Sequence, residues 1–272
     1  MSLYLFIDGA YLSRTIAEFS RKMYDGRDLP FDYQALQAKA SVSKVFYYNA
    51  PPEPKHGETD EAFRLRDDAN TALIERLYDL PNWHISAGVI KTPTNKKAQQ
   101  TQKEVDVQIA VDMLLHTMRK NATEMSFIAG DRDFRPLVDA LIREGMRLRL
   151  FYDPSSIDQE LKRAADIREP MHISFLHQCL AADFQRTNPM PQLFLSQALP
   201  LSPMPKPIFK GQNRRGQIVT IRERSVTHAH IAIRHAESSL STNEWASFDD
   251  VEALKRYSSV MWGVQAWEHV PQ

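Results

Sequence analysis

Two aspartates each follow a short apolar segment of the chain, which is a typical position for a catalytic carboxylate. Asp8 comes directly after Leu3–Ile7, and Asp131 comes after Met125–Ala129 and one glycine. In open α/β sheets the first and fourth strands are commonly neighbours, and their carboxyl ends open a crevice where ligands bind. We therefore expect Asp8 and Asp131 to face one crevice.

Three further aspartates have a spacing that suits the same crevice. Asp133 lies two residues beyond Asp131, Asp106 lies at the start of the amphipathic segment Val105–Met118, and Asp112 lies about 120° around that helix from Asp106. Crowded carboxylates raise one another's pKa unless a cation neutralises them. Oxygen ligands at this charge density suit Mg²⁺ or Mn²⁺ rather than zinc, and such ions polarise phosphoryl groups and orient water. The expected chemistry is hydrolysis of a phosphate ester.

The same residues also have a simpler interpretation. Asp8 and Asp133 stand where N-caps stand, with Pro136 in the first turn of the helix that follows. Two of the nine glycines, Gly9 and Gly130, flank the best site aspartates, where we expect a tight turn that needs a residue without Cβ.

Composition excludes several other kinds of site. Neither a G-x-G-x-x-G nor a G-x-x-x-x-G-K-[ST] phosphate loop is present. The single cysteine, Cys179, excludes an internal disulfide framework and a multi-cysteine zinc site. The chain has no basic leader and no apolar run long enough to span a membrane, so we expect a cytoplasmic protein without membrane association.

Short apolar segments alternate with longer amphipathic ones, which predicts a parallel α/β sheet flanked by helices. The expected strands are Leu3–Ile7, Lys44–Tyr48, His84–Val89, Met125–Ala129, Met146–Phe151 and a possible last strand His172–Leu176. The expected helices are Ala10–Met23, Tyr33–Ala40, Glu61–Leu80, Val105–Met118, Phe134–Glu144 and Ser156–Asp166. Asp32 is the expected N-cap of the second helix, and Gly145 the expected residue after the fifth.

The composition changes after about residue 180. We expect a domain over residues 1–182, a proline-rich linker over 183–207 and a smaller C-terminal extension over 208–272. The formal net charge is zero, but residues 206–235 carry seven lysines and arginines against Glu223 alone, a net charge of +6. This basic segment is either an RNA-holding surface or a face that pairs with the acidic residues after it.

The site motifs resemble those of a known family. Ile7-Asp8-Gly9, then Lys103-Glu104-Val105-Asp106 with Asp112, and then Gly130-Asp131-Arg132-Asp133-Phe134 are similar in order and spacing to the NYN domains of the PIN-like nuclease superfamily. The resemblance covers about residues 1–180 and implies a compact Rossmannoid fold, a pocket for a divalent metal and a role as a ribonuclease or RNA-processing factor. It also implies that Asp8, Asp106, Asp131 and Asp133 are the metal-site carboxylates.

Cations beside these aspartates could hold an RNA backbone. The loop 91–103 is basic and contains no acid, so Lys96, Lys97 and Lys103 are candidates for phosphate contacts. Arg132 lies between two site aspartates and suits either a phosphate contact or a structural ion pair.

Two functions stay open at this point. The first is a metal-dependent endoribonuclease, and the second is a non-catalytic RNA-binding or regulatory module. The second has support from Tyr11, where the family often has asparagine, and from Ala129 and Arg132, where it often has small hydroxyl residues. A phosphatase of the haloacid-dehalogenase type fits poorly, because it needs a second aspartate at position 10, which is Ala10.

Overall fold

The structure is a computed structural model that describes residues 3–54, 56–87, 98–196, 203–223, 230–235 and 243–271. The chain forms two compact units. The first contains Met1–Ala17 and Phe31–Met171, and the second contains Glu18–Pro30 and His172–Gln272.

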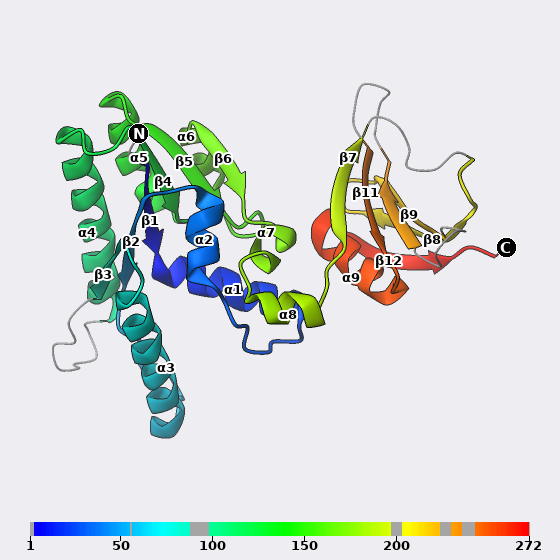
Figure 1. The fold of residues 1–272 in the computed structure, drawn as a ribbon, viewed down its shortest axis with the longest axis horizontal. Helices are drawn as coiled ribbons and strands as arrows, with labels where there is room; N and C mark the ends of the chain where they lie inside the picture. The colour runs from blue at the N-terminus through cyan, green and yellow to red at the C-terminus, as the bar shows by residue number, and fades with distance from the viewer. Residues whose placement is uncertain are drawn as a thin grey trace. The chain divides into compact units, whose positions relative to one another are not determined.

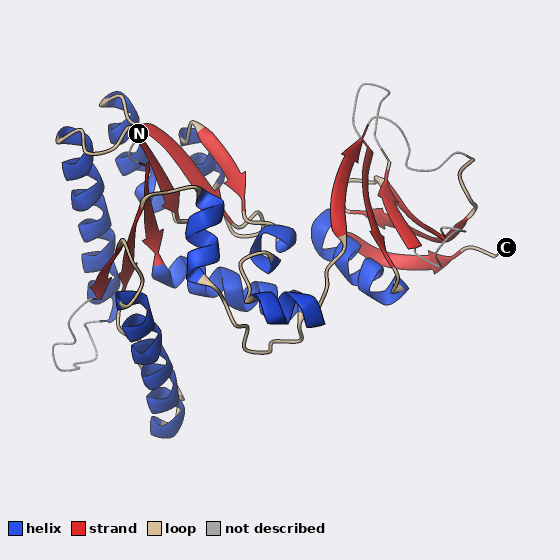
Figure 2. Cartoon of the chain, viewed as in Figure 1, coloured by secondary structure: helices blue, strands red, loops and turns tan. Residues whose placement is uncertain are grey.

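The first unit is built on a six-stranded sheet in the order β3-β2-β1-β4-β5-β6. Its strands are β1 Leu3–Asp8, β2 Lys44–Asn49, β3 Trp83–Ala87, β4 Glu124–Ile128, β5 Arg147–Tyr152 and β6 Ile167–Pro170. All five neighbouring pairs are parallel, and β1 pairs with both β2 and β4 (Figures 1 and 2). The predicted parallel α/β fold is confirmed, as is the expectation that the first and fourth strands are neighbours.

Helices lie on both sides of this sheet (Figure 1). They are α1 Gly9–Met23, α2 Tyr33–Ala40, α3 Asp60–Tyr78, α4 Ala98–Met118, the 3-10 turn η1 Arg132–Phe134, α5 Arg135–Arg143 and α6 Gln159–Ala164. Strand side chains alternate between the two faces. Phe6 and Phe127 therefore join α4 and α5 residues such as Ile109 and Leu141 in one buried cluster. The other face of the sheet buries residues such as Tyr47.

Local signals in the sequence account for several element boundaries. Asp32 caps α2, with its carboxylate accepting from the backbone N–H groups of Gln34 and Ala35 at 2.9 and 3.0 Å. Gly145 follows α5 with φ +80°, as its predicted position requires. The helix predicted over Ser156–Asp166 is shorter, because Asp158 caps it.

The strand predicted over His172–Leu176 is wrong. Residues Ile173–His177 form helix α7, and the last strand of the sheet is β6, a few residues earlier. The His172 ring nitrogen accepts a hydrogen bond from the Phe175 backbone N–H at 3.2 Å and so caps α7. Short apolar segments fit a buried helix as well as a strand, and here the cap decides the outcome.

The second unit contains a second six-stranded sheet, which is antiparallel and has the order β12-β8-β9-β10-β11-β7. Its elements are α7, α8 Ala182–Thr187, β7 Gln192–Ser196, β8 Pro207–Asn213, β9 Ile218–Glu223, β10 His230–Arg234, β11 Asn243–Phe248, α9 Val251–Trp262 and β12 Val264–His269. Strand β7 lies inside the segment predicted as a linker and pairs with β11. Ile221, Ile231 and Leu254 of α9 are fully buried, so these residues have a core of their own.

Two further features concern the chain as a whole. Within the described ranges, no helix is long and apolar enough to cross a membrane. Cys179 is buried and forms no disulfide.

Candidate active site

Asp8 is a buried carboxyl at the carboxyl end of β1. Only 4% of its surface is exposed, and its Oδ1 accepts a hydrogen bond from the Tyr11 backbone N–H at 3.0 Å. Asp8 therefore also ties down the first turn of α1, as its cap interpretation predicts. Burial raises the pKa of Asp8 from 3.8 to about 6, although the Tyr11 hydrogen bond opposes the rise.

Asp106 is the second carboxyl at this place. It lies in the third turn of α4, which packs against β1 and β2, and its side chain is half-buried. Its negative charge raises the pKa of Asp8 further, whereas Arg14 of α1 lowers it. The fold thus brings together two carboxyls that lie almost one hundred residues apart in the sequence.

Asp131 and Asp133 follow β4, the neighbour of β1, and both are exposed. The Asp131 Oδ1 accepts from the Asp133 backbone N–H at 3.0 Å and caps η1. The cap at this turn is therefore Asp131 rather than Asp133. Both residues stand at the carboxyl edge of the sheet, where the sequence predicts them.

The carboxyls can be tested against the ligand set of a divalent metal. Within the part of the chain that the structure describes, no group of three or more histidine, cysteine, aspartate or glutamate side chains is arranged to hold an ion. Mg²⁺ is often bound by only one or two protein carboxylates and keeps several waters. Asp8 and Asp106 fit this coordination preference, because both donate oxygen ligands and a bound cation would relieve the repulsion between them.

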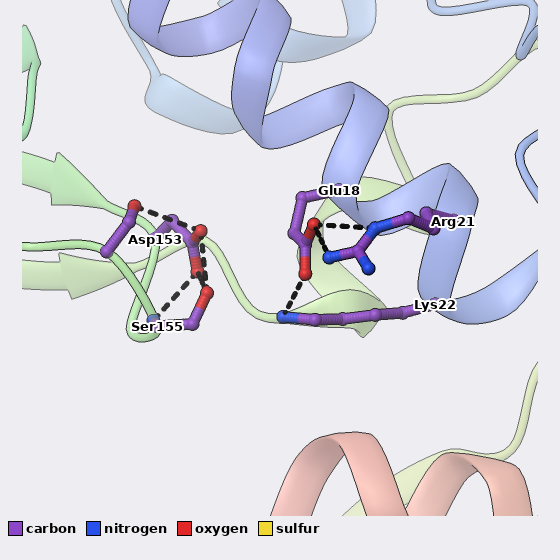
Figure 3. A network of polar contacts seen from close by, with 6 residues as sticks. Glu18, Arg21, Lys22, Asp153 and Ser155 are labelled. Atoms are coloured by element: carbon purple, nitrogen blue, oxygen red, sulfur yellow. Dashed lines mark hydrogen bonds and ion pairs between the residues drawn. The ribbon is translucent and has the colours of Figure 1, made fainter.

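A third strand end contributes polar groups that the sequence analysis missed. Asp153 follows β5, and its carboxylate accepts from the Ser155 backbone N–H at 2.9 Å and from the Ser155 and Ser156 hydroxyls at 2.8 and 3.1 Å (Figure 3). The Asp153 backbone N–H donates to the Tyr11 hydroxyl at 2.8 Å. The signal was present, since Asp153 directly follows the apolar strand β5, and Asp8 likewise stands at the carboxyl end of β1.

Figure 3 also draws a separate set of ion pairs near the end of α1. The Glu18 carboxylate pairs with the Arg21 guanidinium and with the Lys22 ammonium group, the latter at 3.0 Å. Hydrogen bonds from Arg21 and then Lys22 lower the pKa of Glu18. These partly exposed pairs support the last turns of the helix.

Comparison with known proteins decides the family. The model of the NYN domain matches residues 2–170, which is more than half of the chain. The chain belongs to the NYN domain family. Residues 2–170, which include the six-stranded parallel sheet, thus form an NYN domain of the PIN-like nuclease superfamily.

Two other comparisons add no functional argument. Among curated proteins nothing matches the chain. Among solved structures, a protein of unknown function from Vibrio parahaemolyticus matches 66% of this chain and 96% of its own, at 15% identity and a TM-score of 0.42. A likeness of this size carries no conclusion about the NYN domain described here.

Gly9 and Gly130, which flank the site aspartates, are explained by packing rather than by backbone conformation. Neither Gly9 nor Gly130 has a positive φ. A Cβ on Gly9 would lie 2.6 Å from the Tyr47 ring and 2.7 Å from the Tyr48 carbonyl oxygen, and a Cβ on Gly130 would overlap the Tyr11 ring. The expected need for residues without Cβ at these two positions is confirmed, and its physical reason is the space taken by the Tyr47 and Tyr11 rings.

Asp112 is engaged by a strand of the NYN domain. The Tyr48 hydroxyl of β2 donates to the Asp112 carboxylate at 2.8 Å. Asp112 also lies about 9 Å farther along the axis of α4 than Asp106. Its predicted place at the edge of a metal site stays a prediction.

The candidate phosphate contacts have different outcomes. Arg132 is exposed and its guanidinium forms an ion pair with Glu160 at 2.9 Å, as does that of Arg135 at 2.6 Å. The structural interpretation of Arg132 is therefore realised. Lys96 and Lys97 lie outside the described residues, and Lys103 lies within α4.

Proposed function

We propose that the NYN domain is a divalent-metal-dependent endoribonuclease that hydrolyses phosphodiester bonds of RNA. The observation that carries the proposal is the pair of Asp8 and Asp106. A buried carboxyl with a pKa raised to about 6 beside a second carboxylate lowers the stability of the fold at neutral pH. Groups with such perturbed pKa values cluster at functional sites. Membership in a nuclease superfamily gives this function its chemical class.

The residues of the chain would act by position and charge. Asp8, fixed by the Tyr11 backbone N–H, and Asp106, fixed on α4, would hold Mg²⁺ or Mn²⁺, and Asp131 and Asp133 would complete the acidic set from the adjacent strand end. A bound ion of this kind supplies polarisation of a phosphoryl oxygen and an activated water. Asp131 and Asp133 are exposed, so an RNA backbone can approach them.

Cations around this edge would offset the charge of the RNA. We assign phosphate contacts to Lys96, Lys97 and Lys103, which precede Asp106 in the sequence. We assign a further phosphate contact to Arg132, which lies between Asp131 and Asp133. Arg132 is two-thirds exposed, and exposed ion pairs such as that with Glu160 are weak, so a phosphate can replace Glu160 as its partner.

One observation favours a second candidate, an RNA-binding or regulatory module without catalysis. The described carboxyls do not form a group of three that could hold an ion. In that case the NYN domain would bind RNA through the same cations, and its acids would have no role in turnover.

Parallel assays of binding and cleavage separate the two candidates. Labelled single-stranded RNA is incubated with the chain in Mn²⁺, Mg²⁺ or EDTA, and both the bound fraction and the products are measured. The nuclease proposal predicts products only with a divalent ion, and their loss in Asp131→Asn. Tight binding without products in any ion would favour the second candidate.

A further inference from the structure

The outward side of α4 is apolar, which is unusual for a helix that covers a sheet. Val107, Val111, Leu115 and Met118 are 62%, 47%, 39% and 72% exposed. At 100° per residue, these four positions fall within about 80° of the helix surface. Four of the seven large hydrophobic residues found exposed in the described chain thus form one stripe.

The stripe lies on a different side of α4 from the residues that pack into the core. Val105, Ile109 and Met113 are buried in the main cluster, so the inner side of the helix is already satisfied. A surface helix normally presents polar residues on its other side. Contiguous apolar patches on a protein surface mark interaction sites.

The charges at the two ends of the stripe identify the kind of partner. Glu104 lies one turn before Val107, and Arg119 directly follows Met118; both are exposed. Neither side chain forms an ion pair within the described residues. The stripe therefore has an acid at its amino end and a base at its carboxyl end, so it complements itself when a copy is turned end to end.

We infer that α4 is the contact surface of a homodimer, with the two helices antiparallel about a two-fold axis at Val111. In this arrangement Val111 packs on the partner's Val111, and Val107 packs on the partner's Leu115. Glu104 then lies beside the partner's Arg119, and the symmetry repeats each contact. Helices packed through such side chains lie about 8 to 10 Å apart.

Sedimentation velocity of the full chain over a range of concentrations tests the surface. The wild-type chain should dimerise, and Val111→Glu should weaken dimerisation by about tenfold or more, because two carboxylates then meet at the axis. Leu65→Glu is the matched control, since Leu65 is a 66% exposed leucine on α3. Circular dichroism checks that each variant is folded. A monomeric wild-type chain, or equal weakening by Leu65→Glu, would overturn the inference.

A charge exchange tests the antiparallel register. Glu104→Arg or Arg119→Glu alone should weaken the dimer by about fivefold, because each places like charges together. The double variant restores both opposite pairs and should recover the wild-type affinity. If the double variant instead shows the sum of the two single effects, the inference that a second copy of the chain binds in this register is refuted.

Discussion

Asp8 of β1 and Asp106 of α4 form a repelling pair in which burial and the second carboxylate together raise the pKa of Asp8 to about 6. The unfolded chain has no such environment, and there the pKa is near 3.8. At neutral pH the ionised Asp8 carboxylate therefore lowers the stability of the folded chain. Two consequences follow from this pair, one for stability and one for metal binding.

Asp8→Asn should stabilise the metal-free chain at pH 7. Between about pH 4 and pH 6 the folded state binds more protons at Asp8 than the unfolded state does, so the free energy of unfolding falls as the pH rises through this range. The full difference corresponds to about 3 kcal/mol at pH 7 and vanishes below about pH 3. Urea unfolding in EDTA at both pH values measures it.

The control for this substitution is Asp133→Asn, since Asp133 is exposed. It should leave the free energy of unfolding nearly unchanged at either pH. Asp8→Asn keeps the oxygen that accepts from Tyr11, so the cap is retained. If Asp8→Asn is less stable than the wild-type chain at pH 7, the buried Asp8 charge does not destabilise the fold as proposed.

Divalent ions should stabilise the wild-type chain through the same pair. Mn²⁺ at one hundred times its dissociation constant should add about 2.7 kcal/mol to the free energy of unfolding. Thermal melts with and without Mn²⁺ measure the effect. Asp8→Asn and Asp106→Asn should lose it, whereas Asp139→Asn, at a half-exposed position of α5, should retain it. Equal stabilisation of all four chains would place the ion elsewhere.

Gly130→Ala should destabilise the NYN domain by about 1 to 3 kcal/mol, because the added methyl group overlaps the Tyr11 ring. Removing that ring should relieve the overlap. Gly130→Ala combined with Tyr11→Ala is therefore expected to cost less than the sum of the two single substitutions, in a double-mutant cycle of unfolding free energies. Strict additivity would mean that the two residues do not share this space.

Arg132→Ala should weaken RNA binding without changing stability. Its exposed ion pair with Glu160 contributes at most about 1 kcal/mol to folding, whereas a lost phosphate contact lowers the slope of log affinity against log salt by about one. Glu160→Gln, which removes the competing carboxylate, should strengthen binding. An unchanged salt slope in Arg132→Ala would remove this residue from the RNA surface.

The sequence was sufficient to predict five of the six strands of the NYN domain's sheet, because these strands are short apolar segments bounded by turn residues. The neighbours β1 and β4 and the positions of Asp8 and Asp131 follow from that pattern. Helix α7 was mistaken for a strand, since five apolar-rich residues fit either structure and the capping role of His172 depends on its local fold.

Contacts between distant residues could not be predicted in the same way. Nothing near Tyr11 in the sequence indicates that its ring fills the space beside Gly130 or that its hydroxyl accepts from Asp153. The antiparallel pairing of β7 was hidden by the prolines around it. Such contacts depend on how the chain packs, which local spacing does not encode.

The most direct test of the proposed function is the single-turnover rate of RNA cleavage in Mn²⁺ for the wild-type chain, Asp8→Asn and Asp139→Asn. The account predicts a rate at least about a hundredfold lower in Asp8→Asn, because the ion and the water that it activates lose a ligand, and an unchanged rate in Asp139→Asn. RNA binding measured on the same samples should be retained. Cleavage by Asp8→Asn at the wild-type rate would contradict the assignment of this aspartate to the active site.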